Sequence, residues 1–156
     1  MQTKHFLIIV CLFCASMGFA QNKIFEKYAD MNDVTSIYIS KAMFQMMSKI
    51  NTGTDGVNID NLKGKIESLQ LVATEKPDKI AQMKKDFSQF IKSVQYQELM
   101  RIKDESSRVH FYSVTAPNDQ IKELIMLIED ENDYTAILLT GNFTLKDIQD
   151  ITNKDK

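Results

Sequence analysis

Hydrophobic residues in the middle of the chain recur with the period of an α-helix. Pro77 suits the first turn of a helix, because its ring fixes φ and it has no amide hydrogen to donate. Apolar residues then follow at three- and four-residue intervals, with lysines and acids between them. They are Ile80, Met83, Phe87, Phe90, Ile91 and Val94. This pattern predicts one long amphipathic helix that buries its apolar side against the rest of the protein.

Shorter elements precede this helix. Residues 34–39 are β-branched and aromatic, and residues 66–74 alternate apolar and polar positions, so both segments predict strands. The spacing of the apolar residues in 21–30 predicts a short helix. Ser40 is placed to cap a second helix, whose shared face would hold Met43, Met46, Met47 and Ile50. Glycines among polar residues predict a loop over 51–64.

The C-terminal third predicts four strands followed by a helix. The strands are residues 96–103, 109–114, 123–129 and 134–140, and short polar turns join them in pairs. Two of them contain continuous apolar runs, 124–128 and 136–139, which is typical of strands covered on both faces. Gly141 is expected to end the last strand. Thr144 and Asp147 then form a capping box for the final helix, with Phe143 and Ile148 as its hydrophobic staple.

The order of these elements predicts an α+β fold. Strands that follow two strand–helix units favour a two-layer sandwich, in which helices pack on one face of a mixed, mostly antiparallel sheet of about six strands. The length of 156 residues suits a single domain, and 44% hydrophobic residues exclude a disordered chain. A net charge of −2 gives no support to nucleic-acid binding.

The N-terminal residues 1–20 have the organisation of a secretory signal peptide. Lys4 and His5 precede an apolar run over 6–13, and Gly18 and Ala20 occupy positions −3 and −1 of a cut before Gln21. The run is short for a transmembrane helix, so we expect cleavage and no stable membrane span afterwards. The mature protein is then a single domain over 21–156.

Cleavage at this point removes both cysteines of the chain. Cys11 and Cys14 lie within residues 1–20, so the mature chain has no disulfide, thiolate nucleophile or cysteine-based metal site. Its one histidine is His110, in a predicted strand, where a structural role is more common than catalysis. No nucleophile elbow or phosphate-binding glycine loop is present. We therefore expect no catalytic residue and no cofactor.

Three segments leave a binding role open. Glu129, Asp130, Glu131 and Asp133 form an acidic turn whose oxygens suit calcium, although the spacing and the glycine of an EF-hand loop are missing. A solvated hairpin tip is the favoured interpretation, and the same two alternatives apply to residues 52–60. Four methionines within 31–47 indicate core filling or, less commonly, an adaptable binding surface.

Several short blocks of sequence resemble a known family. They are residues 25–28 (FEKY), 34–44 (VTSIYISKAMF), 66–70 (IESLQ), 99–104 (LMRIKD) and the closing 140–144 (TGNFT). In this order they are similar to domain of unknown function (DUF) 4252, found in exported proteins of Bacteroidetes-type bacteria. The family carries no established activity, so the resemblance implies no site residue. It implies a Gram-negative envelope setting, most simply the periplasm.

Together these features predict an exported, non-catalytic interaction module of the bacterial cell envelope. Its partner would be a protein of that compartment rather than nucleic acid. Two alternatives remain at this point. One is a hydrolase that uses carboxylates and His110, and the other is a calcium-binding module that uses the acidic turn over 129–133.

Overall fold

The computed structural model is a two-layer α+β structure, described here for residues 23–47, 64–115, 120–144 and 146–147. Six strands form one antiparallel sheet in the order β1-β2-β6-β5-β4-β3. The strands are β1 (Thr35–Ser40), β2 (Ile66–Thr74), β3 (Gln97–Lys103), β4 (Arg108–Thr115), β5 (Gln120–Glu129) and β6 (Tyr134–Thr144). The helices are α2 (Lys23–Ala29), α3 (Lys41–Met47) and α4 (Pro77–Val94).

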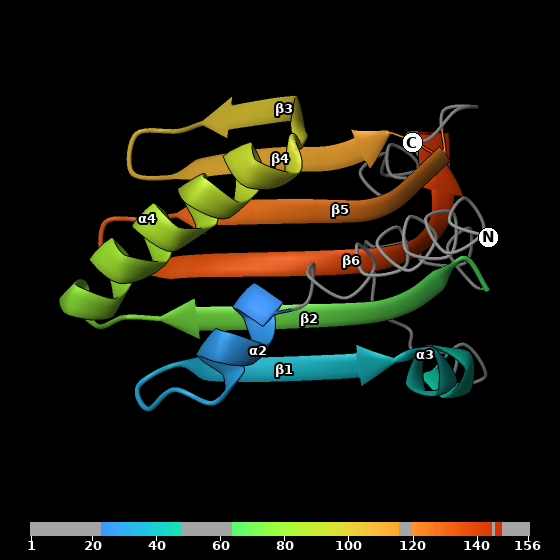
Figure 1. Ribbon diagram of the computed structural model, residues 1–156, viewed down its shortest axis with the longest axis horizontal. Helices are drawn as coiled ribbons and strands as arrows, with labels where there is room; N and C mark the ends of the chain where they lie inside the picture. Colours follow the sequence, from blue (N-terminus) through green and yellow to red (C-terminus); the bar gives the residue numbers. More distant parts are fainter. Residues whose placement is uncertain (1–22, 48–63, 116–119, 145, 148–156) are drawn as a thin grey trace, which may run out of the picture.

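Helices α2 and α4 lie on one face of the sheet, which we call the helix face (Figure 1). Helix α4 crosses the strands diagonally and buries Met83, Phe87 and Ile91, as its sequence periodicity predicts. Its C-terminus is closed by Gln95, whose φ of 59° allows the Tyr96 amide to donate to the Ile91 carbonyl.

Aromatic rings dominate the core beneath the two helices. The Phe87 ring is fully buried and lies 5.2 Å from that of Phe25 and 5.8 Å from that of Tyr28, measured between centroids. Tyr134 of β6 completes the contact from the sheet. The Tyr28 hydroxyl donates to the Asp86 carboxylate of α4 at 2.6 Å. This bond fastens α2 to α4 at the edge of the core.

The predicted fold class is confirmed, with one difference in the sheet. Every described strand pair is antiparallel, whereas a mixed sheet was expected. Tight turns join β3 to β4 and β5 to β6, and this geometry produces antiparallel neighbours. Strand β5 also begins three residues before the predicted start at Glu123.

The prediction that Gly141 ends the last strand is wrong, because β6 continues through it to Thr144. At Gly141 the backbone of Lys65 passes so close that a Cβ atom would lie 2.2 Å from the Lys65 carbonyl oxygen. The next amide, of Asn142, donates to the same carbonyl at 2.8 Å. Glycine is therefore needed here for close pairing with the start of β2 rather than for chain termination.

The predicted capping box is confirmed. The Thr144 amide donates to Asp147 Oδ2 at 2.8 Å, and the Asp147 amide donates to Thr144 Oγ1 at 3.3 Å. Its staple residue Ile148, the loop over 52–60 and the signal peptide over 1–20 lie outside the described residues. Within the described ranges, no helix has the length and apolar character needed to span a membrane.

Candidate functional site

The face of the sheet opposite α2 and α4, which we call the outer face, presents an apolar side chain from every strand. The register of the sheet aligns one residue per strand in a central row. This row consists of Ile37, Leu71, Ile137, Met126, Phe111 and Met100, in the order of the strands. Because side chains alternate along a strand, these six share one face.

The two neighbouring rows of the outer face are also free of charge. One row is Thr35, Ala73, Thr135, Ile128, Val109 and Ile102. The other is Ile39, Leu69, Leu139, Leu124, Ser113 and Gln97. Along the same stretch of the strands, the charged residues Glu98 and Arg101 and the titratable His110 occupy the alternate positions, on the helix face. The outer face is therefore a continuous uncharged surface across all six strands.

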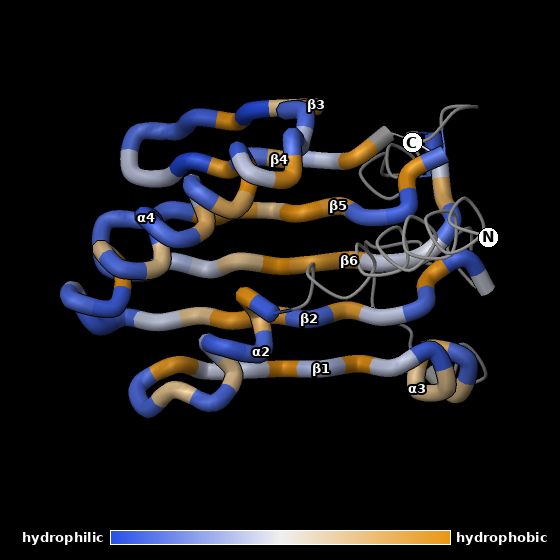
Figure 2. Tube along the Cα trace, viewed as in Figure 1, coloured by the Kyte–Doolittle hydropathy of each residue, from blue (hydrophilic) through white to orange (hydrophobic). Residues whose placement is uncertain are grey.

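The outer face is apolar but only partly covered. The side chains of Ile37, Met100 and Ile102 are 45%, 44% and 49% exposed to solvent, and the central positions of β2, β5 and β6 are half-buried. On the helix face the same strands bury Val72, Ala136 and Leu138 almost completely. Figure 2 shows uninterrupted hydrophobic stretches in β5 and β6, where residues of both faces are apolar. Contiguous, partly exposed apolar surfaces commonly mark interaction sites in proteins.

One end of the outer face has its own small core. Ile66, Ile121, Leu124 and Phe143 are buried there, and Phe44 of α3 packs against them. Ser113 is buried in the adjoining row, and no hydrogen bond to its hydroxyl is found within the described part of the chain.

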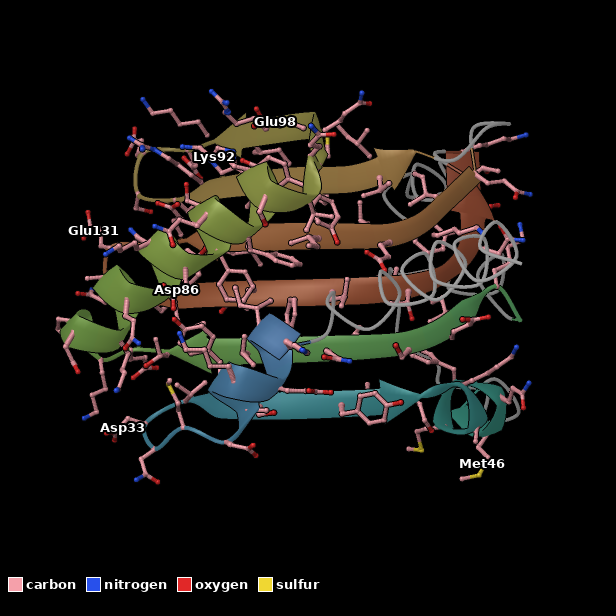
Figure 3. All side chains as sticks on the ribbon, viewed as in Figure 1. Asp33, Met46, Asp86, Lys92, Glu98 and Glu131 are labelled. Atoms are coloured by element: carbon pink, nitrogen blue, oxygen red, sulfur yellow. The ribbon has the colours of Figure 1, made fainter. Side chains whose placement is uncertain are left out.

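The prediction that the methionines of α3 fill the core is wrong for two of them. Met43 and Met46 are 46% and 60% exposed, because Phe44 takes the inward position of this short helix. Figure 3 shows Met46 at the far end of α3, directed away from the sheet. Met31, by contrast, packs against the main core, as expected.

His110 belongs to a polar cluster on the helix face, beside the β3 edge. Its Nδ1 lies 2.8 Å from Glu98 Oε1, and its ring stacks on that of Tyr112 with centroids 6.0 Å apart. Arg101 donates two hydrogen bonds to the same Glu98 carboxylate, at 2.8 and 2.6 Å. The Arg101 guanidinium, and after it His110, lower the pKa of Glu98 to about 2.

This cluster has the orienting half of an acid–base site, and the described residues supply no nucleophile beside it. A carboxylate bound to an imidazole orients the ring in hydrolases, where a serine or cysteine lies at the other nitrogen. Among the described residues, the hydrogen-bonding contacts of His110 are Glu98 and Tyr112, and the hydroxyl of Ser113 lies on the outer face. Sequence reasoning missed Glu98 and Arg101, because strand pairing brings them to His110 from another strand.

The acidic side chains of the 129–133 turn have different partners rather than a shared one. Glu129 of β5 pairs with Lys84 of α4 at 3.2 Å, and the Asp130 carboxylate accepts the Glu131 amide at 2.7 Å. The Asp130 amide donates to the Asp133 carbonyl and closes the hairpin. In the described part of the chain, no three acidic or histidine side chains converge in a way that suits a metal ion.

The comparison with known families matches residues 28–151 to the domain of unknown function DUF4252. The chain belongs to the DUF4252 family. The match includes all six strands of the sheet and most of the described helical residues. Neither a curated protein nor a solved structure matches the chain.

One signal in the sequence does indicate the outer face of this DUF4252 protein. The apolar runs over 124–128 and 136–139 place hydrophobic residues on both faces of β5 and β6. The strand order makes these two strands the centre of the sheet. The contribution of the other four strands depends on the register, which no single segment reveals.

Proposed function

We propose that this protein is an exported, non-catalytic interaction module of the bacterial cell envelope, and that it binds protein through the outer face of its sheet. The observation that carries the proposal is the absence of charge from three successive rows across six strands. A soluble protein gains by placing charge on a face that remains in water, and by excluding it where another apolar surface docks.

Two further features support binding over catalysis. The most organised polar cluster, Glu98 with Arg101 and His110, is closed on itself by short hydrogen bonds. Among the exposed large hydrophobic residues of the described ranges, Ile37, Met100 and Ile102 lie at the two edges of the outer face and Met43 and Met46 on α3, whereas Tyr38 lies on the helix face. Export is supported by the organisation of residues 1–20, and it would place the module in the periplasm or at the envelope.

Adjacent residues of β1 provide a matched test. Ile37 and Tyr38 are both exposed, but they point to opposite faces of the same edge strand. The tagged protein should capture a partner from envelope extract, and Tyr38→Lys should capture it equally well. Ile37→Lys should lose the partner while keeping the fold, because it buries a lysine in the docked surface. Equal capture by both variants would contradict the proposal.

A further inference from the structure

We infer that the outer face is covered by the outer face of a second copy of this chain, with equivalent strands stacked antiparallel to one another. The inference rests on the proposed function, because it names the occupant of the surface proposed there. Stacking two sheets face to face is a common way to bury an apolar sheet surface, with the sheets about 10 Å apart.

The area of the face suits such a dimer. Six strands spaced by about 4.8 Å, with three rows of side chains, present a surface of about 29 by 20 Å, or on the order of 600 Å². The positions of Leu124 and Ser113 within it are already buried inside the protein. Two copies would therefore bury on the order of 1,000 Å² in total, which is about the lower limit for a specific interface. In a symmetric dimer the same surface of both copies meets itself, so this surface must not bring like charges together. The three uncharged rows satisfy this requirement, since no like charges can meet.

The charges at the two ends of the sheet select the direction of stacking. The turns before β1, after β2, between β3 and β4, and between β5 and β6 all lie at one end. These turns contain eight acidic residues and one basic residue, Lys76. The acidic residues are Asp30, Asp33, Glu75, Asp104, Glu105, Asp130, Glu131 and Asp133. Figure 3 shows Asp33 and Glu131 at this end and Met46 at the other.

The described residues at the opposite end have a small excess of lysine. Lys41, Lys122 and Lys146 are exposed there, against Glu67 and Glu123, and Lys65 pairs with Asp147 at 2.7 Å. Parallel stacking would bring the two acidic ends together, whereas antiparallel stacking places each acidic end over the lysine-bearing end of the other copy. Opposite potentials therefore favour the antiparallel arrangement.

The same acidic end disfavours a lipid bilayer as the occupant. A membrane surface with anionic lipids attracts basic residues around an apolar patch. Here the turns at one end of the patch carry a clear excess of acidic residues, although Lys76, Lys103 and Arg108 also lie at that end. A second copy offers an uncharged apolar face together with a complementary end.

Antiparallel stacking makes a specific geometric prediction. A two-fold axis along the central row places Ile37 of β1 opposite Ile37 of the other copy, and Met100 of β3 opposite Met100. With parallel stacking, Ile37 would instead face Met100, at the opposite edge of the sheet. The two arrangements can be separated by cross-linking, because the only cysteines of the chain are Cys11 and Cys14, within the predicted signal peptide.

The test combines sedimentation velocity with thiol cross-linking of the purified protein in the form that the cell accumulates. Wild type and Tyr38→Lys should sediment as dimers. Ile37→Lys and, separately, Met100→Lys should raise the dimer dissociation constant by about tenfold or more, with unchanged circular dichroism. A bifunctional reagent of about 12 Å reach should link Ile37→Cys to itself. An equal mixture of Ile37→Cys and Met100→Cys should give no heterodimer product.

Several outcomes would overturn the inference. A monomer at every concentration, or a dimer insensitive to both lysine variants, would remove the second copy from the outer face. A heterodimer product in the mixture would contradict the antiparallel direction. If the wild type is monomeric and Ile37→Lys unfolds the protein, the outer face is covered by the chain itself. If the wild type is monomeric and binds phosphatidylglycerol–phosphatidylethanolamine vesicles, the outer face is assigned to lipid.

The proposed function fails on a different result. If the protein is monomeric but Ile37→Lys loses an envelope partner that Tyr38→Lys retains, the dimer is excluded and the interaction module stands. If the protein is monomeric and neither variant affects any partner, both proposals fall.

Discussion

At the scale of single residues, Phe87 is the point on which the core depends most. Its ring is fully buried and contacts Phe25, Tyr28 and Tyr134, which come from α2 and β6. Phe87→Ala removes these contacts and leaves a cavity between the helices and the sheet. We expect a loss of about 3–5 kcal/mol in the free energy of unfolding, measured by urea denaturation. Phe90→Ala, at a half-buried position, should cost clearly less, and equal losses would contradict this packing.

Glu98 makes stability depend on pH in the acid range. Its pKa is lowered from 4.5 to about 2 in the folded protein by Arg101 and then His110. A carboxylate with a depressed folded pKa stabilises the protein fully above its unfolded pKa, and this contribution is lost as the pH falls through the folded pKa. Because Glu98 is largely exposed, we expect its contribution to be about 1 kcal/mol or less.

Glu98→Gln should therefore reduce the loss of unfolding free energy between pH 4.5 and about 2. Urea denaturation across this range measures the effect, with the exposed Glu67→Gln as the control. An identical pH profile for Glu98→Gln and wild type would show that the cluster with Arg101 and His110 does not persist in solution.

At the scale of elements, the acidic turn of the β5–β6 hairpin can be tested as either a solvated turn or a calcium site. The carboxylates of Glu129 and Asp130 already have partners within the protein, Lys84 and the Glu131 amide. Millimolar calcium should then raise the stability by less than about 1 kcal/mol, whereas a micromolar site would add about 4 kcal/mol. Thermal unfolding measures the difference. A large calcium-dependent shift that Asp130→Asn with Asp133→Asn abolishes would establish the site instead.

The helices and strands themselves could be predicted well from local patterns. The periodicity of α4, the alternation of β2 and the capping box at Thr144 are all local signals, and all three are confirmed. Gly141 was misread because its role depends on the close approach of the Lys65 backbone, which lies just before β2 and is far from Gly141 in the sequence. The cluster around His110 was missed for the same reason, since the β3–β4 register brings Glu98 and Arg101 to it.

At the scale of the whole molecule, function depends on where the chain is delivered and on which face it docks. The organisation of residues 1–20 predicts removal by signal peptidase before Gln21. N-terminal sequencing or intact-mass measurement of the protein from the envelope fraction should find Gln21 as its first residue. Recovery of the envelope protein with Met1 intact would contradict cleavage and with it the mature chain free of cysteine.

The asymmetry between the two faces of the sheet is the central feature of the molecule. One face is sealed by α2 and α4 over an aromatic core, and the other presents uncharged rows across six strands with exposed Ile37 and Met100 at its edges. Local patterns predicted the sealed face, whereas the full extent of the outer face follows only from the register of all six strands.

Photo-cross-linking in living cells tests the role of the outer face most directly. A photoreactive amino acid placed at Ile37 should form a cross-linked protein product in the envelope, since this side chain would lie in the docked surface. The same amino acid at Tyr38, the adjacent and more exposed residue, should not, because it points to the helix face. A product at Tyr38 but not at Ile37, or no product at either position, would contradict the assignment of the outer face as the interaction surface.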